Sequence, residues 1–249
     1  MDRDEWEPED LDPEELLEDV QEPIARPSYS FLSERPSRKA FWPGVVFALL
    51  ATATSVAAWN VSGFKADWIG NPQKIFSGGE WWRLFTSMLL HSDIEHLLSN
   101  LLFLIPFGGL LTNYFGWRVF PWLGLALGTA TQALSLKTYP AGANLLGASG
   151  LLYVLFGLWL SLYFRAETHL RWTNKLMRVV GFGLVMFIPS QFQSNVSYRT
   201  HYIGLAAGLA AGALYGAFLF KKDWFKKDRA VPLSPPRPKI VPRPGGTLH

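Results

Sequence analysis

Six stretches of the chain contain no Asp, Glu, Lys or Arg, and each is about as long as a helix that crosses a lipid bilayer. They are residues 40–64, 97–117, 119–136, 138–164, 179–198 and 202–220. A span needs about 20 mostly apolar residues, because a helix rises about 1.5 Å per residue across a hydrocarbon core about 30 Å thick. The pattern therefore predicts an all-α membrane protein, a bundle of six transmembrane helices.

Two connections between these stretches differ from simple turns. The stretch 138–164 is longer than one span and holds Pro140 and Gly142 near its start, so we expect its helix to begin near Ala148 after a loop. The connection 60–96 is long and poor in charge. It carries tryptophans, which favour the membrane–water boundary, and this predicts an interfacial loop that dips into the outer leaflet. Those tryptophans are Trp68, Trp81 and Trp82.

Charge divides the chain into a central region and two tails. Residues 1–40 carry 13 acidic and 5 basic side chains, a net charge of −8, whereas the remaining residues carry a net charge of +11. We expect 1–39 to be an acidic, disordered cytoplasmic tail, 40–220 to be the six-helix domain, and 221–249 to be a basic, proline-rich cytoplasmic tail. Because the basic charge is not gathered on one surface, the composition does not indicate nucleic-acid binding.

Basic residues near the segment ends set the expected orientation. With a cytoplasmic N-terminus, most Lys and Arg residues, including the Lys221–Lys227 cluster, fall on the inner side. Cytoplasmic loops of membrane proteins carry this excess of positive charge. The sequence thus predicts that both termini lie in the cytoplasm.

The polar residues at the segment ends converge at one depth. In the predicted orientation the second, fourth and sixth helices all start at the outer face, with His96 and Asn100, Ser149, and His201 near their respective starts. His96 and Asn100 are four residues apart and share one side of their helix. Polar and ionisable residues at membrane depth are costly and suggest a functional site.

Small residues allow the fourth and sixth helices to approach closely. Gly204, Gly208 and Gly212 repeat at every fourth position and can pack against Gly150 of the fourth helix. This packing would bring His201 to Ser149, so that His201 removes the serine proton as a general base. The oxyanion would meet the Ser149 N–H group and the side chains of His96 and Asn100. The chain has no cysteine, which excludes a thiol nucleophile and disulfides.

With these residues in place, the sequence resembles the rhomboid family of intramembrane serine proteases over residues 41–220. The family's signatures match in order along the chain. They match at Glu80-Trp81-Trp82-Arg83, at His91, at His96 and Asn100, at Gly147-Ala148-Ser149-Gly150 with Tyr153, and at His201, Gly204 and Gly208. Some bacterial members have a further histidine where this chain has Ser87.

The resemblance implies hydrolysis of a peptide bond in or beside the transmembrane helix of another membrane protein. It implies Ser149 and His201 as the catalytic dyad and His96 and Asn100 as oxyanion donors. Supporting roles fall to Gly147, Gly150, Tyr153, Gly204, Gly208, Trp82 and Arg83. No metal or cofactor is implied, and the expected partners are transmembrane substrates and the bilayer of a bacterial inner membrane.

Two other interpretations fit parts of the pattern. A catalytically silent rhomboid-like protein would bind membrane clients without cleaving them, although such proteins typically lack the serine or the histidine. A small transporter would line its path with the same polar residues. Transporters often contain an internal repeat, and none is visible between residues 40–136 and 138–220.

Overall fold

The computed structural model describes residues 32, 35–167, 170–187 and 197–221. Within these ranges the chain is helical, and the only β-type pairing is an isolated antiparallel bridge between Gly70 and Leu145. The expected tails, 1–39 and 221–249, lie almost entirely outside the described residues. The elements are η2 (Arg38–Phe41), α2 (Trp42–Asn60), α3 (Phe64–Trp68), η3 (Gln73–Ser77), α4 (Arg83–Thr86), η4 (Ser87–Leu89), α5 (Ile94–Phe115), η5 (Arg118–Leu123), α6 (Gly124–Leu136), α7 (Ser149–Ala166), α8 (Trp172–Phe187) and α9 (Tyr198–Lys221).

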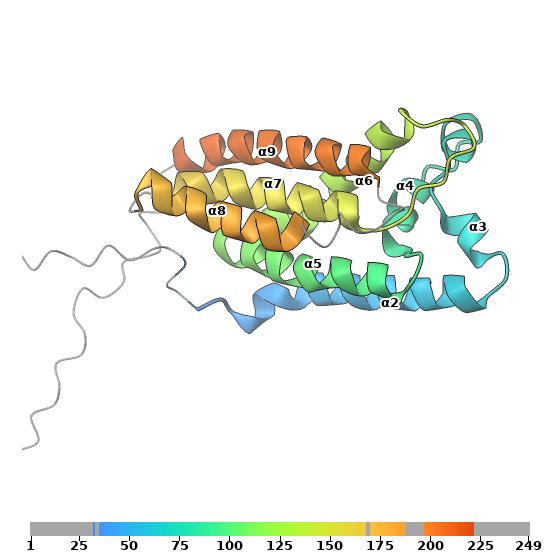
Figure 1. Ribbon diagram of the computed structural model, residues 1–249, viewed down its shortest axis with the longest axis horizontal. Helices are drawn as coiled ribbons and strands as arrows, with labels where there is room; N and C mark the ends of the chain where they lie inside the picture. Colours follow the sequence, from blue (N-terminus) through green and yellow to red (C-terminus); the bar gives the residue numbers. More distant parts are fainter. Residues whose placement is uncertain (1–31, 33–34, 168–169, 188–196, 222–249) are drawn as a thin grey trace, which may run out of the picture.

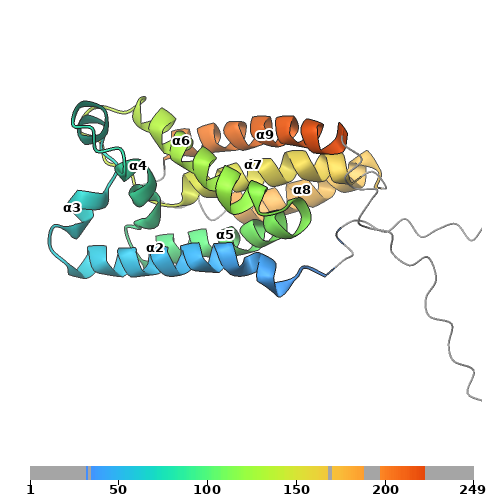
Figure 2. The same ribbon diagram turned by 180° about the vertical axis from the view of Figure 1, so that it is seen from behind.

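The long helices form a bundle around α7. Helices α2, α5, α7 and α9 run along its length, with α8 on one side and α6 on the other (Figures 1 and 2). Helix α7 is the central helix, because 67% of its apolar window is buried, against 28% to 44% in the four other candidate spans. The all-helical membrane bundle predicted from the sequence is confirmed.

Five described helical segments are long and apolar enough to cross a membrane. They are Arg38–Asn60, Ile94–Phe115, Arg118–Leu136, Ser149–Ala166 and Tyr198–Phe218. The charge-free stretch 179–198 predicts a sixth span, and its described part lies in α8, which begins earlier, at Trp172, and has 16 described residues. Residues 188–196 lie outside the described ranges, so the sixth span stays a prediction.

The segment between α2 and α5 is a folded unit of short helices at one end of the bundle (Figure 1). Its core contains Ile75 and Leu84, packed with Leu136 of α6 and Leu145 of the loop before α7. Trp81 and Trp82 are exposed. The sequence predicted an interfacial loop here, and the structure shows that much of this connection is helical.

Arg83 holds this segment together from within. Its side chain is almost fully buried, and its Nη1 donates hydrogen bonds to the carbonyl oxygens of Ala66 and Ile69 at 2.8 and 3.2 Å. Its Nε lies 2.5 Å from a carboxylate oxygen of Glu80. Arg83 therefore ties the end of α3 to the start of α4.

Replacing Arg83 with alanine is expected to lower the free energy of unfolding by about 3 kcal/mol, because it leaves the Glu80 carboxylate and the Ile69 carbonyl without the Arg83 donor and removes one of two donors to the Ala66 carbonyl. The measurement is equilibrium or thermal unfolding of the purified chain in detergent. Lys74→Ala is the matched control, since the exposed Lys74 donates to the same Ala66 carbonyl at 3.2 Å and is expected to cost less than about 1 kcal/mol. Equal losses in the two variants would contradict this role of Arg83.

Candidate active site

Ser149 is the first residue of α7, and Ala148 is its N-cap. The helix begins here as predicted, directly after Gly147, whose φ of +110° lies in a region that side chains with a Cβ rarely adopt. Ser149 is half-buried, whereas Ala148 and Gly150 on either side are buried. The local backbone thus presents one partly accessible hydroxyl at a helix N-terminus, where N–H groups lack partners within the helix.

Three contacts fix the loop before Ser149, residues 145–148, to the segment between α2 and α5. The first is a pair of backbone hydrogen bonds, the second is a single backbone hydrogen bond, and the third is a hydrogen bond to a histidine side chain. Leu145 and Gly70 exchange backbone hydrogen bonds of 2.8 and 3.0 Å, the Gly147 N–H donates to the Ser87 carbonyl at 2.9 Å, and the Ala148 N–H donates to His91 Nε2 at 3.4 Å. The position of the serine is therefore set by residues 57 to 75 positions earlier in the chain.

His91 connects this loop to α2. Because its Nε2 accepts from the Ala148 N–H, its Nδ1 carries the hydrogen and donates to Ser55 Oγ at 3.2 Å. The Trp59 indole N–H donates to the His91 carbonyl at 2.9 Å. Burial lowers the pKa of His91 to about 3, with a smaller contribution from the nearby His96, so the ring is neutral in the folded protein.

Acid is expected to destabilise the fold through His91. Between about pH 6.5 and about 3 the unfolded chain binds a proton at His91 that the folded chain does not, so stability falls as the pH falls through this window. The contribution approaches about 1.4 kcal/mol per pH unit. Unfolding of the wild type and of His91→Gln in detergent at several pH values checks this, because glutamine keeps polar contacts without titrating. Identical slopes in the two proteins would contradict it.

The start of α5 places His96 beside the serine loop. A Cβ added to Gly147 would lie 2.8 Å from His96 Cε1, so the ring packs directly against that glycine. His96 Nδ1 is 3.1 Å from Ser92 Oγ, and the His96 N–H donates to the Asp93 carboxylate, which caps α5. The hydrogen bond from Ser92 is the main cause that lowers the pKa of Asp93. Asn100 is buried and donates from Nδ2 to the His96 carbonyl at 2.9 Å, which uses one of its two amide hydrogens.

His201, on α9, packs against the face of α7 that carries Ser149. Its ring stacks on the ring of Tyr153 with centroids 4.1 Å apart and planes 11° apart, and Tyr153 is one helical turn after Ser149. Tyr198 contacts the His201 ring edge-on. In the described part of the chain, no hydrogen bond joins the Ser149 hydroxyl to the His201 ring.

Helices α7 and α9 touch through their backbones. A Cβ added to Gly204 would lie 2.5 Å from the Gly150 carbonyl oxygen, and one added to Gly208 would collide with the Val154 carbonyl oxygen. Gly150 in turn faces the methyl group of Thr200, the residue before His201. The small residues predicted to permit close packing therefore lie at the contact between the two helices. They allow the first turns of α7 and α9 to come together.

The structure thus gathers most of the predicted site residues in one place. Those at the common end of α5, α7 and α9 are Gly147, Ser149, Gly150, Tyr153, His96, Asn100, His201 and Gly204. Trp82 and Arg83 are not part of this cluster, because their hydrogen bonds stay within the segment between α2 and α5. Gly70 and Ser55 also position the serine loop, and no pattern in the sequence indicated this role. Across the described residues, no group of three or more His, Cys, Asp or Glu side chains could hold a metal ion.

The family model for the Rhomboid domain matches residues 78–218. The match covers more than half of the chain and includes α5, α6, α7, α8 and nearly all of α9. Together with the five apolar helices, it shows that the chain belongs to the rhomboid family and is an integral membrane protein.

Proteins similar to this chain come from a bacterium, a protozoan and a plant. The Bacillus subtilis protein YdcA is 31% identical over 134 residues, which are 53% of this chain and 66% of YdcA. Rhomboid-like protease 2 of Toxoplasma gondii is 29% identical over 165 residues, 64% of this chain and 56% of that protein. RHOMBOID-like protein 1 of Arabidopsis thaliana is 40% identical over 149 residues, 58% of this chain and 36% of that protein. The matched region spans two thirds or less of each relative.

Proposed function

We propose that the chain is an intramembrane serine endopeptidase that cleaves transmembrane segments of other membrane proteins through a Ser149–His201 dyad. The observation that carries this proposal is the stack of His201 on Tyr153, one turn from Ser149 on the same face of α7. Family membership and relatives named as proteases support protease chemistry.

The proposed reaction follows from these positions. His201 accepts the proton of the Ser149 hydroxyl while Oγ attacks the carbonyl carbon of the scissile peptide bond. His201 then donates that proton to the leaving amine, and a water molecule activated by the same ring hydrolyses the acyl-enzyme. The Ser149 N–H belongs to the first turn of α7 and has no partner within its helix, so it suits the oxyanion.

His96 and Asn100 are the proposed side-chain donors to the oxyanion. The packing of His96 on Gly147 supports this role, because Gly147 is only two residues before the proposed nucleophile, Ser149. Asn100 retains one amide hydrogen after its bond to the His96 carbonyl. Each donor of this kind is worth roughly 10²- to 10³-fold in rate.

The proposed setting is a bacterial inner membrane with both termini in the cytoplasm. The excess of Lys and Arg at the ends of the predicted spans on that side supports this orientation. The site then faces the outer side of the membrane, and the partners are transmembrane proteins that reach it within the bilayer.

A fluorophosphonate probe tests whether Ser149 is an activated nucleophile. The purified full-length chain in detergent is expected to form one covalent adduct at Ser149, located by peptide mass spectrometry. The adduct is expected to be absent in Ser149→Ala and to form roughly 100-fold or more slowly in His201→Ala, which lacks the base. Ser99→Ala is the control, since Ser99 is a half-buried neighbour whose hydroxyl donates to the His96 carbonyl.

The same experiment separates the proposed protease from the alternatives. A folded wild type that forms no adduct supports a catalytically silent protein that binds membrane clients. An adduct on another serine contradicts the proposed dyad. A transporter also forms no adduct, and it is recognised separately by solute uptake into vesicles that contain the protein.

A further inference from the structure

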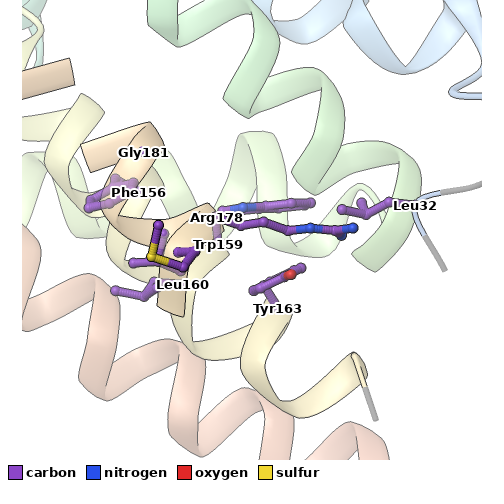
Figure 3. Close-up of a pocket in the computed structure, with 9 residues that line it drawn as sticks. Leu32, Phe156, Trp159, Leu160, Tyr163, Arg178 and Gly181 are labelled. Carbon is purple, nitrogen blue, oxygen red and sulfur yellow. The ribbon is translucent and has the colours of Figure 1, made fainter. Parts of the chain in front are cut away.

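A cavity of about 300 Å³ lies between α7 and α8, with Leu32 from the chain before α2 also lining it, away from the candidate active site (Figure 3). Helix α7 contributes Phe156, Trp159 and Tyr163 to its wall. Trp159 is ten residues after Ser149 along α7, which places it about 15 Å from the serine along the helix axis. The cavity is therefore a separate site, in the other half of the bundle.

The cavity is a groove with an apolar wall that opens to the surroundings of the bundle. The three aromatic residues from α7 are spaced three and four apart, so they form one continuous buried face. On the α8 side, Met177 is 70% exposed, and a Cβ added to Gly181 would meet nothing within 4 Å. We call this space, between the α7 aromatic residues and Met177 to Gly181, the α7–α8 groove.

One end of the groove is positively charged. Arg178 lines it, and its side chain extends along the groove in Figure 3. Lys175 precedes it by three residues and shares its side of α8, and Arg171 directly precedes the helix. Among the described residues the nearby carboxylate, Glu167, is fully buried, and the other described acidic residues lie between Asp67 and Glu95, at the opposite end of the bundle.

The sequence places this charge at the boundary of the membrane. The charge-free stretch 179–198 begins directly after Arg178, so Arg178 is the last charged residue before the predicted span. Long basic side chains at such positions extend toward the polar headgroups while their carbon chains stay in apolar surroundings. Gly181 and Phe156 then line the part of the groove that lies in the hydrocarbon layer.

We propose that the α7–α8 groove binds an anionic glycerophospholipid, with the phosphate on Arg178 and one acyl chain against Phe156 and Trp159. A phospholipid has this same distribution of properties, since its charge is confined to one end of an apolar body. Basic pockets between transmembrane helices on the cytoplasmic side are known to bind anionic headgroups. Arg171 and Lys175 add to the attraction, and the bilayer supplies the ligand directly to the open side of the groove.

Photolabelling of the full-length protein in phosphatidylcholine vesicles tests the proposal. The probes are phosphatidylglycerol and phosphatidylcholine that carry the same photoreactive acyl chain, and the labelled peptides are identified by mass spectrometry. The wild type is expected to show labelling of the α7 peptide around Trp159 several-fold stronger with phosphatidylglycerol. Arg178→Gln is expected to lower the ratio of the two probes about fivefold, the effect of one basic residue near an anionic lipid.

Two further variants make the result specific. Arg118→Gln removes an exposed basic residue outside the groove and is expected to leave the ratio unchanged. Gly181→Leu places a side chain in the groove and is expected to reduce labelling by both probes. Thermal unfolding verifies that each variant is folded, and Ser149→Ala is expected to be labelled like the wild type, because the groove does not depend on catalysis.

Three outcomes would overturn the proposal. One is equal labelling of the wild-type groove by the two probes, and another is an unchanged ratio in Arg178→Gln. The third is chemical crosslinking of the groove to the chain's own acidic segment, residues 1–31, in place of lipid labelling.

Discussion

Replacement of Ser149 with alanine is expected to abolish cleavage of a single-span membrane substrate, with a fall in kcat of about 10⁴-fold or more. Alanine keeps the first turn of α7 but removes the oxygen that forms the acyl-enzyme in the proposed mechanism. The measurement is the rate of product formation by purified protein in liposomes, followed by gel or mass spectrometry. Retained cleavage in Ser149→Ala would contradict the proposed mechanism.

The double variant sharpens this test. Residues that act as one unit are not additive, so Ser149→Ala combined with His201→Ala is expected to be no slower than Ser149→Ala alone. Ser161→Ala is the control, since Ser161 lies three turns further along the same helix and donates to the Leu209 carbonyl at 2.8 Å. It removes a hydroxyl between α7 and α9 without touching the site, and near-normal cleavage is expected.

Replacement of Gly208 with alanine is expected to have the largest effect on stability, a loss of about 3 kcal/mol or more in the free energy of unfolding. The added Cβ would collide with the Val154 carbonyl oxygen and approach Leu158 N to 3.0 Å. Both are backbone atoms of the central helix, so no side-chain rotation relieves the contact, and α9 must move away from α7. Thermal unfolding in detergent measures the loss.

Gly181→Ala is the matched control for this substitution. It makes the same chemical change in another helix, at a position where the added Cβ meets nothing within 4 Å. It is expected to be neutral or to stabilise the protein by up to about 1 kcal/mol, because alanine favours the helix. Because Gly208 is two turns from His201 on α9, Gly208→Ala is also expected to slow fluorophosphonate labelling of Ser149. Equal stability of Gly208→Ala and Gly181→Ala would show that α7 and α9 are not in backbone contact.

The spans could be predicted from the sequence because the bilayer imposes a length and an absence of charge. The charge-free stretches located five described helices, and the start of α7 was predicted correctly near Ala148, but several other helix ends differ from the ends of the stretches. Helix α5 starts at Ile94, before Glu95, because Asp93 caps it through its side chain. Helix α8 likewise begins at Trp172 and includes Lys175 and Arg178, since charged residues near the headgroups remain helical.

The clustering of Ser149, His96 and His201 could also be anticipated, because the direction of each span puts helix starts at one depth. The contacts that position the serine loop could not. The pairing of Leu145 with Gly70, and the link from Ser55 through His91 to Ala148, depend on how a segment of short helices packs across the bundle. Neither periodicity nor charge encodes such pairings. Of the residues in these contacts, only His91 could be singled out from the sequence, as a histidine at the end of the long connection.

The stack of Tyr153 and His201 also bears on when the protein becomes reactive. The two stacked residues, Tyr153 and His201, are 48 residues apart in sequence. A chain is synthesised from its N-terminus, so Tyr153 is made first. Ser149 is therefore synthesised 52 residues before His201. In the proposed mechanism, a chain that still lacks α9 has the Ser149 alcohol without its base, so the serine becomes reactive only after synthesis has passed residue 201.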